Sequence, residues 1–183
     1  YGVPPAFFEH ALGQHLMYCS GYWPMGIDTL DDSELAMLKL SAERAELSDG
    51  INVLELGCGW GSLTLYMAEN YPKSNITAVS NSKDQRMFIE KKCQERGFEN
   101  VKVITADMNE FTIDNKFERI VSIEMFEHMR NYEQLLDKVS SWLKPQGKLF
   151  IHIFTHKTLV YPFTQDCEGA WKGRNCFRGG LMP

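Results

Sequence analysis

Residues 53–62 constrain the fold more than any other stretch of the chain. They predict an apolar strand, a turn with glycine at every second position (Gly57, Gly59 and Gly61) and the start of a helix. Glycines allow a sharp turn after a strand and let a ligand approach the backbone without a Cβ in the way. The first turn of the following helix offers unpaired N–H groups to a carboxylate or phosphate. The pattern therefore predicts a nucleotide-like cofactor at the first strand–helix junction of an α/β sheet, and a tight turn without a ligand is the alternative.

From residue 49 onward, predicted strands and helices alternate. The strands are expected at 51–56, 75–80, 101–105, 117–123 and 148–154, and the helices at 61–71, 83–96 and 131–143, the last stopped by 144–147. Short apolar strands separated by helices indicate a parallel sheet with helices on both faces. In such sheets ligands bind beyond the carboxyl ends of the strands. The Gly-x-Gly-x-Gly spacing departs from the Gly-x-Gly-x-x-Gly of dinucleotide enzymes.

The chain divides into three predicted parts. Residues 1–47 form an N-terminal helical cap, 48–154 a Rossmann-like cofactor-binding core, and 155–183 the start of a glycine-rich, aromatic lid. The aromatic segment 18–24 is either a core plug or a lid over the cofactor. Because the first residue is Tyr1 and not Met, we expect an excerpt of a longer chain. Further strands after Pro183 would cover the otherwise bare edge of the last strand.

Composition excludes several function classes. The 183 residues carry a net charge of -5, which gives no basic footprint for nucleic acid. The five cysteines contain no Cys-x-x-Cys pair, and no apolar run approaches the length of a membrane span. We therefore expect a reduced, cytoplasmic protein without stable membrane insertion. His152 and His156 are four apart on a predicted strand, a spacing without metal-ligand geometry, so no metal is expected.

Four stretches carry a family resemblance: LELGCGWG at 54–61, SNSKDQRMFIE at 80–90, VSIEMFEHM at 121–129 and GGLMP at 179–183. Together they resemble the coclaurine N-methyltransferase group of class I S-adenosylmethionine-dependent methyltransferases, a branch related to cyclopropane fatty acid synthases. The resemblance implies a class I Rossmann-like fold, an incomplete substrate lid, S-adenosylmethionine as cofactor and S-adenosylhomocysteine as product. It leaves a homodimer open.

The resemblance also implies the cofactor contacts. The glycines of the turn would approach the methionine part, and Tyr18 and Cys19 would close over it. The other implied contacts are Ser80, Asn81, Ser82 and Gln85 at the ribose, Asp107 and Met108 at the adenine, and Ser122 after the fourth strand. No carboxylate follows the second strand, and this absence counts against NAD.

Three residues after the fourth strand match the catalytic positions of the coclaurine-type enzymes. Methyl transfer from a sulfonium depends mostly on alignment, but a protonated amine has no lone pair with which to attack. The resemblance implies that Glu127 and His128 are the acid–base pair and that Glu124 faces the amine. The alternative is that Glu127 and His128 merely cap the helix that begins near Asn131.

Cyclopropane synthase is the sharpest rival interpretation. That family uses a bicarbonate held by Cys, Glu, His and other residues, and here Glu127 and His152 stand at matching positions. However, Ser20 replaces the cysteine, and Glu124 stands where the synthases have glycine. These differences favour N-methylation of a small amine of the benzylisoquinoline type or another aromatic or alkyl amine. A non-catalytic cofactor-binding module is the third hypothesis.

Overall fold

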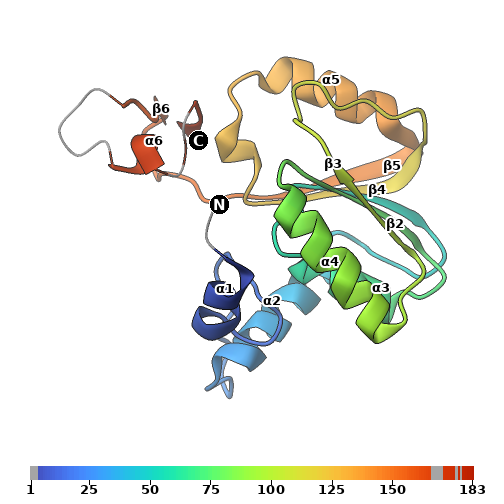
Figure 1. Cartoon of the computed structure of the whole chain (residues 1–183). Coiled ribbons are helices and arrows are strands. Elements are labelled where there is room, and N and C mark those ends of the chain that lie inside the picture. Colours follow the sequence, from blue (N-terminus) through green and yellow to red (C-terminus); the bar gives the residue numbers. More distant parts are fainter. Residues whose placement is uncertain (1–3, 166–170, 176, 178) are drawn as a thin grey trace.

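The computed structural model describes residues 4–165, 171–175, 177 and 179–183. Its main sheet has the strand order β3-β2-β1-β4-β5, and all neighbouring strands in it are parallel (Figure 1). The strands are β1 (Asn52–Leu56), β2 (Asn75–Ser80), β3 (Val101–Thr105), β4 (Phe117–Ile123) and β5 (Leu143–His152). The predicted parallel sheet is therefore confirmed.

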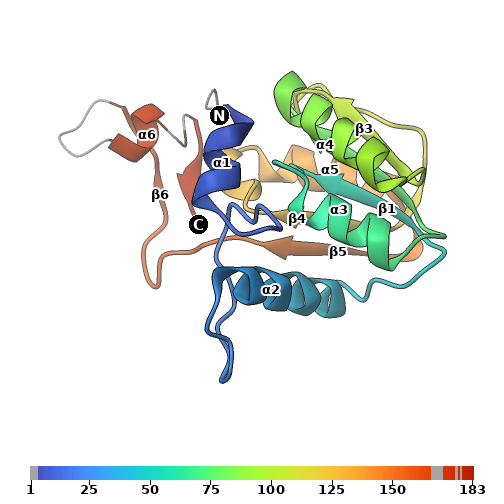
Figure 2. The ribbon, with the colours of Figure 1, turned by 60° about the horizontal axis from the view of Figure 1, so that its bottom comes forward.

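Helices cover both faces of this sheet. They are α1 (Pro5–Ala11), α2 (Leu30–Arg44), α3 (Ser62–Asn70), α4 (Lys83–Arg96) and α5 (Tyr132–Trp142), with a short 3₁₀ helix η1 (Phe126–His128). On one face α5 packs through Leu135 and Val139 against Leu54 of β1. The other face receives α2, α3 and α4, as Figures 1 and 2 show. Alternate residues of β1 point to opposite layers, as expected of a strand buried on both sides.

The connection into β5 differs from the prediction. Leu143 pairs with Phe117, and the next pair joins Arg119 to Lys148, so residues 144–147 form a bulge in β5. Proline has no N–H for a ladder bond, which makes Pro145 suited to a bulge. A Cβ on Gly147 would lie 2.9 Å from the Lys144 carbonyl oxygen, so the bulge folds back tightly on itself. The predicted turn is therefore part of the strand, which ends at His152 and not at residue 154.

The N-terminal cap is less helical than predicted. Over residues 4–47, which the structure describes, the helices are α1 and α2, and a loop over residues 12–29 joins them. In this loop Tyr18 is 61% exposed and Trp23 is 54% exposed. The core-plug interpretation of segment 18–24 is therefore wrong, since these aromatic rings lie at the surface.

The C-terminal part leaves the sheet after β5. It contains a small antiparallel pair, β6 (Tyr161–Pro162) with β7 (Leu181–Met182), and the short helix α6 (Trp171–Asn175). Of the predicted lid, residues 166–170, 176 and 178 lie outside the described residues. Strands after Pro183 stay a prediction. Within the part of the chain that the structure describes, no helix combines the length and the apolar character that a membrane span needs.

Candidate functional site

A cavity of about 420 Å³ lies at the carboxyl ends of the strands. Segments far apart in the sequence converge on it, because parallel strands end at the same edge of the sheet. Most of the site residues predicted from the sequence line this cavity: Tyr18, Cys19, Gly57, Gly59, Ser80, Asn81, Gln85, Asp107, Met108, Glu124 and His128. The predicted residues Gly61, Ser82, Ser122 and Glu127 do not line it.

The glycine turn shapes one wall of the cavity. Gly57, Gly59 and Gly61 have φ angles of 81°, 52° and 85°, in the region that favours glycine. A Cβ on Gly57 would lie 2.8 Å from the Cβ of Met125. A Cβ on Gly61 would lie 2.6 Å from Cγ1 of Ile89, a residue of α4. Gly57 and Gly59 therefore open the cavity, whereas Gly61 lets α3 begin close to α4.

The end of β2 supplies a preformed polar pair. Ser80 Oγ donates to Gln85 Oε1 at 2.6 Å and accepts from the Ser82 N–H at 3.1 Å. Ser82 Oγ accepts from the Gln85 N–H at 3.4 Å and caps α4. Ser80 and Gln85 are buried where they border the cavity. Ser82 therefore acts on the site only by fixing this pair.

Two other predicted contacts have local partners. Asp107 Oδ1 accepts from the backbone N–H of Asn109 at 2.8 Å, which fixes the loop after β3. Ser122 Oγ donates to the Leu56 carbonyl oxygen at 3.0 Å and is 1% exposed. The Ser122 hydroxyl thus ties β4 to the end of β1 and does not face the cavity.

Glu55 is a cavity residue to which the sequence analysis gave no role. It lies on β1, is 4% exposed and accepts a hydrogen bond from Thr64 Oγ1 at 2.5 Å. Burial raises the pKa of this carboxyl to about 8, against the opposing effect of the Thr64 hydrogen bond. The signal in the sequence was a charged residue inside an otherwise apolar strand.

Glu124 and Glu127 form the acidic end of the cavity, and Glu124 is the one that lines it. Its φ of 52° is rare for a residue other than glycine. The backbone N–H of Glu124 donates to the His152 carbonyl oxygen at 2.8 Å, and its Oε1 lies 3.8 Å from His152 Nε2. This conformation is thus supported by β5, and the side chain borders the cavity.

Glu127 lies just behind the cavity on η1. Its exposed fraction is 0%, and neither carboxylate oxygen has a hydrogen-bond partner among the described residues. Burial raises the pKa of Glu127 to about 8, against the opposing effect of its own backbone and with a smaller contribution from neighbouring Glu124. Asn131 is the N-cap residue of α5, and no side-chain hydrogen bond caps this helix. The Glu127 carboxylate therefore does not bind the N-terminus of α5. For Glu127 the helix-capping alternative is therefore wrong.

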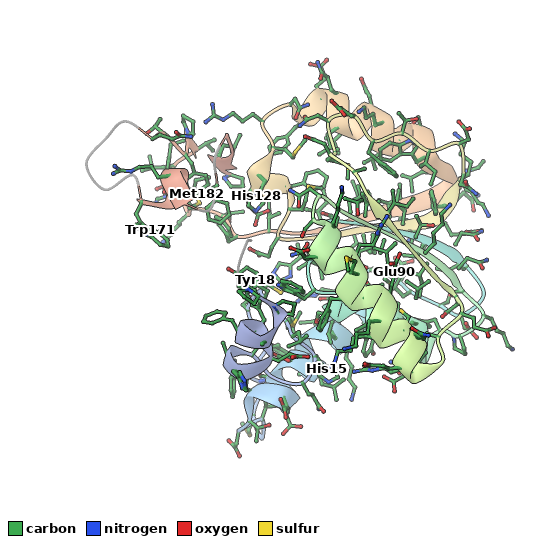
Figure 3. All side chains as sticks on the ribbon, in the orientation of Figure 1. His15, Tyr18, Glu90, His128, Trp171 and Met182 are labelled. Carbon is green, nitrogen blue, oxygen red and sulfur yellow. The ribbon has the colours of Figure 1, made fainter. Side chains whose placement is uncertain are left out.

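His128 faces the cavity beside the C-terminal part of the chain. Its ring centroid lies 4.8 Å from that of Phe177, and Figure 3 shows His128 near Met182 of β7. Burial lowers the pKa of His128, which favours the neutral imidazole that can accept a proton. Burial and the charge of Glu124 raise the pKa of Cys19 to about 12, so this thiol stays protonated at neutral pH.

Comparisons with known proteins agree over the whole chain. The family described as mycolic acid cyclopropane synthetase matches residues 1–183. The chain is 41% identical over 182 residues to (S)-coclaurine N-methyltransferase of Thalictrum flavum subsp. glaucum, covering 100% of this chain and 50% of that protein. It is 31% identical over 185 residues to cyclopropane-fatty-acyl-phospholipid synthase of Escherichia coli (strain K12), covering 100% of this chain and 45% of that protein.

A solved structure is similar as well. The crystal structure of coclaurine N-methyltransferase bound to N-methylheliamine and SAH matches with a TM-score of 0.93 at 38% identity, covering 100% of this chain and 53% of that one. The chain thus spans about half the length of the relatives it matches.

Proposed function

The chain belongs to the mycolic acid cyclopropane synthetase family and has the class I methyltransferase fold, and from this premise we propose that it methylates the nitrogen of a small amine with S-adenosylmethionine as donor. The observation that carries the proposal is the charge of the site. Glu55, Asp107 and Glu124 line the cavity and Glu127 lies behind it, whereas no lysine or arginine is among its described lining residues. The buried Glu55 and Glu127 have raised pKa values and ionise more readily when a cation is near, so the site favours cations, and both a sulfonium and an ammonium are cations.

The cavity fits this donor. Its volume of about 420 Å³ is within the usual range for small-molecule sites. Gly57 and Gly59 present bare backbone, and the Ser80–Gln85 pair presents a fixed hydroxyl and amide. When bound, S-adenosylmethionine supplies an electrophilic methyl group on a positively charged sulfur. We propose Tyr18, Cys19, Gly57, Gly59, Ser80, Asn81, Gln85, Asp107 and Met108 as its contacts.

The acidic end of the cavity would prepare the amine. The carboxylate of Glu124 would hold an incoming ammonium by charge attraction. The buried Glu127 carboxylate, when ionised, would take the proton at one of its unpartnered oxygens, and neutral His128 offers a second acceptor. Removing this proton exposes the nitrogen lone pair, and the walls of the cavity align it for in-line attack.

Aromatic rings next to His128 support an amine that carries an aromatic group. Phe177 lies with its ring centroid 4.9 Å from Phe163 and 5.3 Å from Phe154. These rings pack on one another outside the residues that line the cavity, so they give the His128 side of the site an apolar, aromatic surrounding. The similar coclaurine N-methyltransferase structure contains N-methylheliamine, and we propose a ligand of comparable size here.

Product analysis tests the proposal. Protein, S-adenosylmethionine and a panel of aromatic and alkyl amines are incubated, and the products are identified by mass spectrometry. We expect one added methyl group on an amine, and simultaneous Glu127→Ala and His128→Ala replacement should lower turnover by roughly a hundredfold or more. A parallel incubation contains unsaturated acyl chains in place of amines, and addition of a methylene there with loss of the alkene would instead establish the cyclopropane-synthase alternative. Cofactor binding without methyl or methylene transfer to any of these substrates would support the non-catalytic cofactor-binding module.

A further inference from the structure

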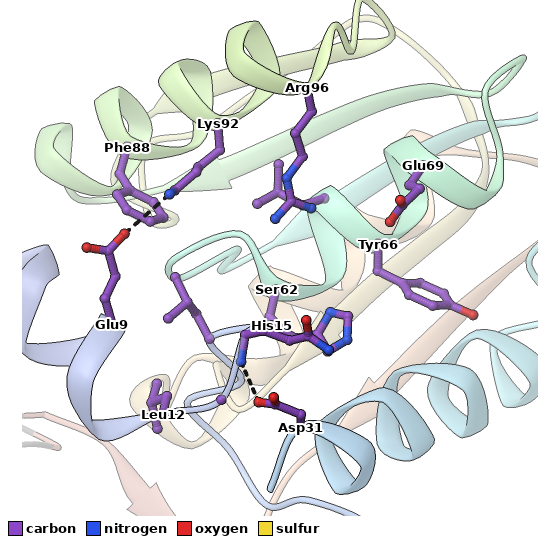
Figure 4. Close-up of a pocket in the computed structure, with 14 residues that line it drawn as sticks. Glu9, Leu12, His15, Asp31, Ser62, Tyr66, Glu69, Phe88, Lys92 and Arg96 are labelled. Atoms are coloured by element: carbon purple, nitrogen blue, oxygen red, sulfur yellow. Dashed lines mark hydrogen bonds and ion pairs between the residues drawn. The ribbon is translucent and has the colours of Figure 1, made fainter.

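Two carboxylates near the start of α2, Asp31 and Glu34, hold the loop that forms one wall of the cavity. Glu34 Oε1 accepts from the Gly13 N–H at 2.9 Å, and Glu34 Oε2 accepts from the His15 N–H at 3.0 Å. Asp31, which faces the same loop in Figure 4, accepts from the Gln14 N–H at 2.8 Å. Three consecutive backbone N–H groups are therefore bound by two carboxylates that lie three residues apart on α2.

Glu34 is the buried member of this pair. It is 1% exposed, whereas Asp31 is exposed. The loop passes so close that a Cβ on Gly13 would lie 2.6 Å from Asp31 Oδ1 and 2.7 Å from Glu34 Oε2. The contact thus depends on a glycine at position 13 as well as on the two acids.

The held loop leads directly into the cavity. The Leu16 N–H donates to the Gly13 carbonyl oxygen at 3.0 Å, and Leu16 has a φ of 51°. After this turn, residues 16–19 line the cavity, including Tyr18 and Cys19. The charge of Glu34 is among the causes that raise the pKa of the Cys19 thiol, so the two groups are electrostatically close.

The other side of the same loop borders a second cavity, of about 280 Å³, shown in Figure 4. Residues 12–16 line this second cavity, and Leu16 borders both. Leu16 and Met17 pack into apolar clusters, whereas residues 13–15 are held by the hydrogen bonds to Glu34 and Asp31. The approach of the loop to the cavity therefore depends on these bonds as well as on packing.

We propose that Glu34 is a positioning residue for the donor site: its carboxylate keeps residues 16–19 against the cavity and thereby sets the affinity for the cofactor. This inference rests on the proposed function, because it takes S-adenosylmethionine and S-adenosylhomocysteine as the ligands. Glu34 itself does not line the cavity and acts through the loop backbone.

Calorimetric titration with S-adenosylhomocysteine tests the role of Glu34 in the Glu34→Gln protein. Glutamine has one acceptor oxygen, and its NH₂ group would meet an N–H donor of the loop, so one of the two bonds is lost. We expect binding about tenfold weaker or more. The matched control is Glu43→Gln at the exposed far end of α2, where affinity should stay within about twofold of wild type.

Two further readouts separate positioning from a general loss of structure. Amide hydrogen exchange of residues 13–15 should accelerate in Glu34→Gln, and KM for the cofactor should rise with little change in kcat at saturation. Gly13→Ala, which pushes the loop away without removing a charge, should weaken binding in the same direction and decides the matter if Glu34→Gln does not fold. Wild-type affinity and exchange in a folded variant overturn the positioning role alone, whereas a wild-type protein that binds no S-adenosylhomocysteine overturns the proposed function with it.

Discussion

Replacing Glu127 with glutamine should stabilise the folded protein at alkaline pH while it removes the proposed proton acceptor. The pKa of Glu127 is raised from 4.5 to about 8 in the folded state, so folding favours its protonated form. Below pH 4.5 the carboxyl is protonated in both the folded and the unfolded protein and does not lower the free energy of unfolding. As pH rises from there through about 8, ionisation increasingly favours the unfolded chain, and stability falls.

The pKa difference sets a ceiling on this loss. From 4.5 to about 8, it corresponds to about 5 kcal/mol. The effective dielectric constant at buried sites is well above that of dry protein, so we expect about 2–3 kcal/mol of the ceiling to be observed. Glutamine resembles the protonated carboxyl in shape and cannot ionise, so the variant should escape this loss.

Urea denaturation at pH 5, 7 and 9 measures the effect. The free energies of unfolding of wild type and Glu127→Gln should be similar at pH 5 and should separate progressively to pH 9. Glu55, whose pKa is also raised to about 8, makes both proteins lose stability over this range, so the difference between them is the informative quantity. Exposed Glu99 provides the control, because Glu99→Gln should follow wild type at every pH. Parallel curves for wild type and Glu127→Gln would refute the reasoning.

Two more predictions concern the backbone of the site. Glu124→Gly should raise the free energy of unfolding by about 1 kcal/mol, because glycine tolerates the φ of 52°, and should lower amine methylation. Thermal denaturation measures the first effect and turnover the second. An unchanged turnover would show that Glu124 does not act on the amine. Gly57→Ala should weaken S-adenosylhomocysteine binding by about tenfold or more, because the added Cβ would lie 2.8 Å from Met125. Calorimetry compares this variant with Gly59→Ala, whose added Cβ meets no protein atom within 4 Å. Equal losses of affinity in the two variants would show that the contact with Met125 is not responsible.

Much of the core could be predicted because its signals are local. The bounds predicted for β2, α4, β3 and β4 are those observed, since apolar runs, the Ser82 cap and Gly97 all act within a few residues. The bulge in β5 could not be predicted in the same way. It depends on pairing with β4, where Leu143 and Lys148 meet Phe117 and Arg119.

The site was predictable by position but not by side-chain direction. The carboxyl ends of parallel strands meet, so residues such as Ser80 and Asp107 lie at the cavity. Whether a nearby hydroxyl faces a ligand depends on its closest partner, and Ser122 bonds the Leu56 carbonyl instead. The contacts of Glu34 join residues 19 and 21 positions apart, and no periodic pattern in the sequence marks such pairs.

The burial of Glu127 has a physical rationale on the proposed function. A buried carboxylate without a hydrogen-bond partner costs stability whenever it is ionised, and the neighbouring Glu124 adds to this cost. A positive charge placed in the cavity favours the ionised form and so lowers the pKa of Glu127 toward its ordinary value. On the proposed function, arrival of the cations would therefore convert a protonated acid into the base that the amine requires. The same carboxyl can then be tolerable in the resting fold and reactive in the loaded site, because its charge appears only when a compensating charge is present.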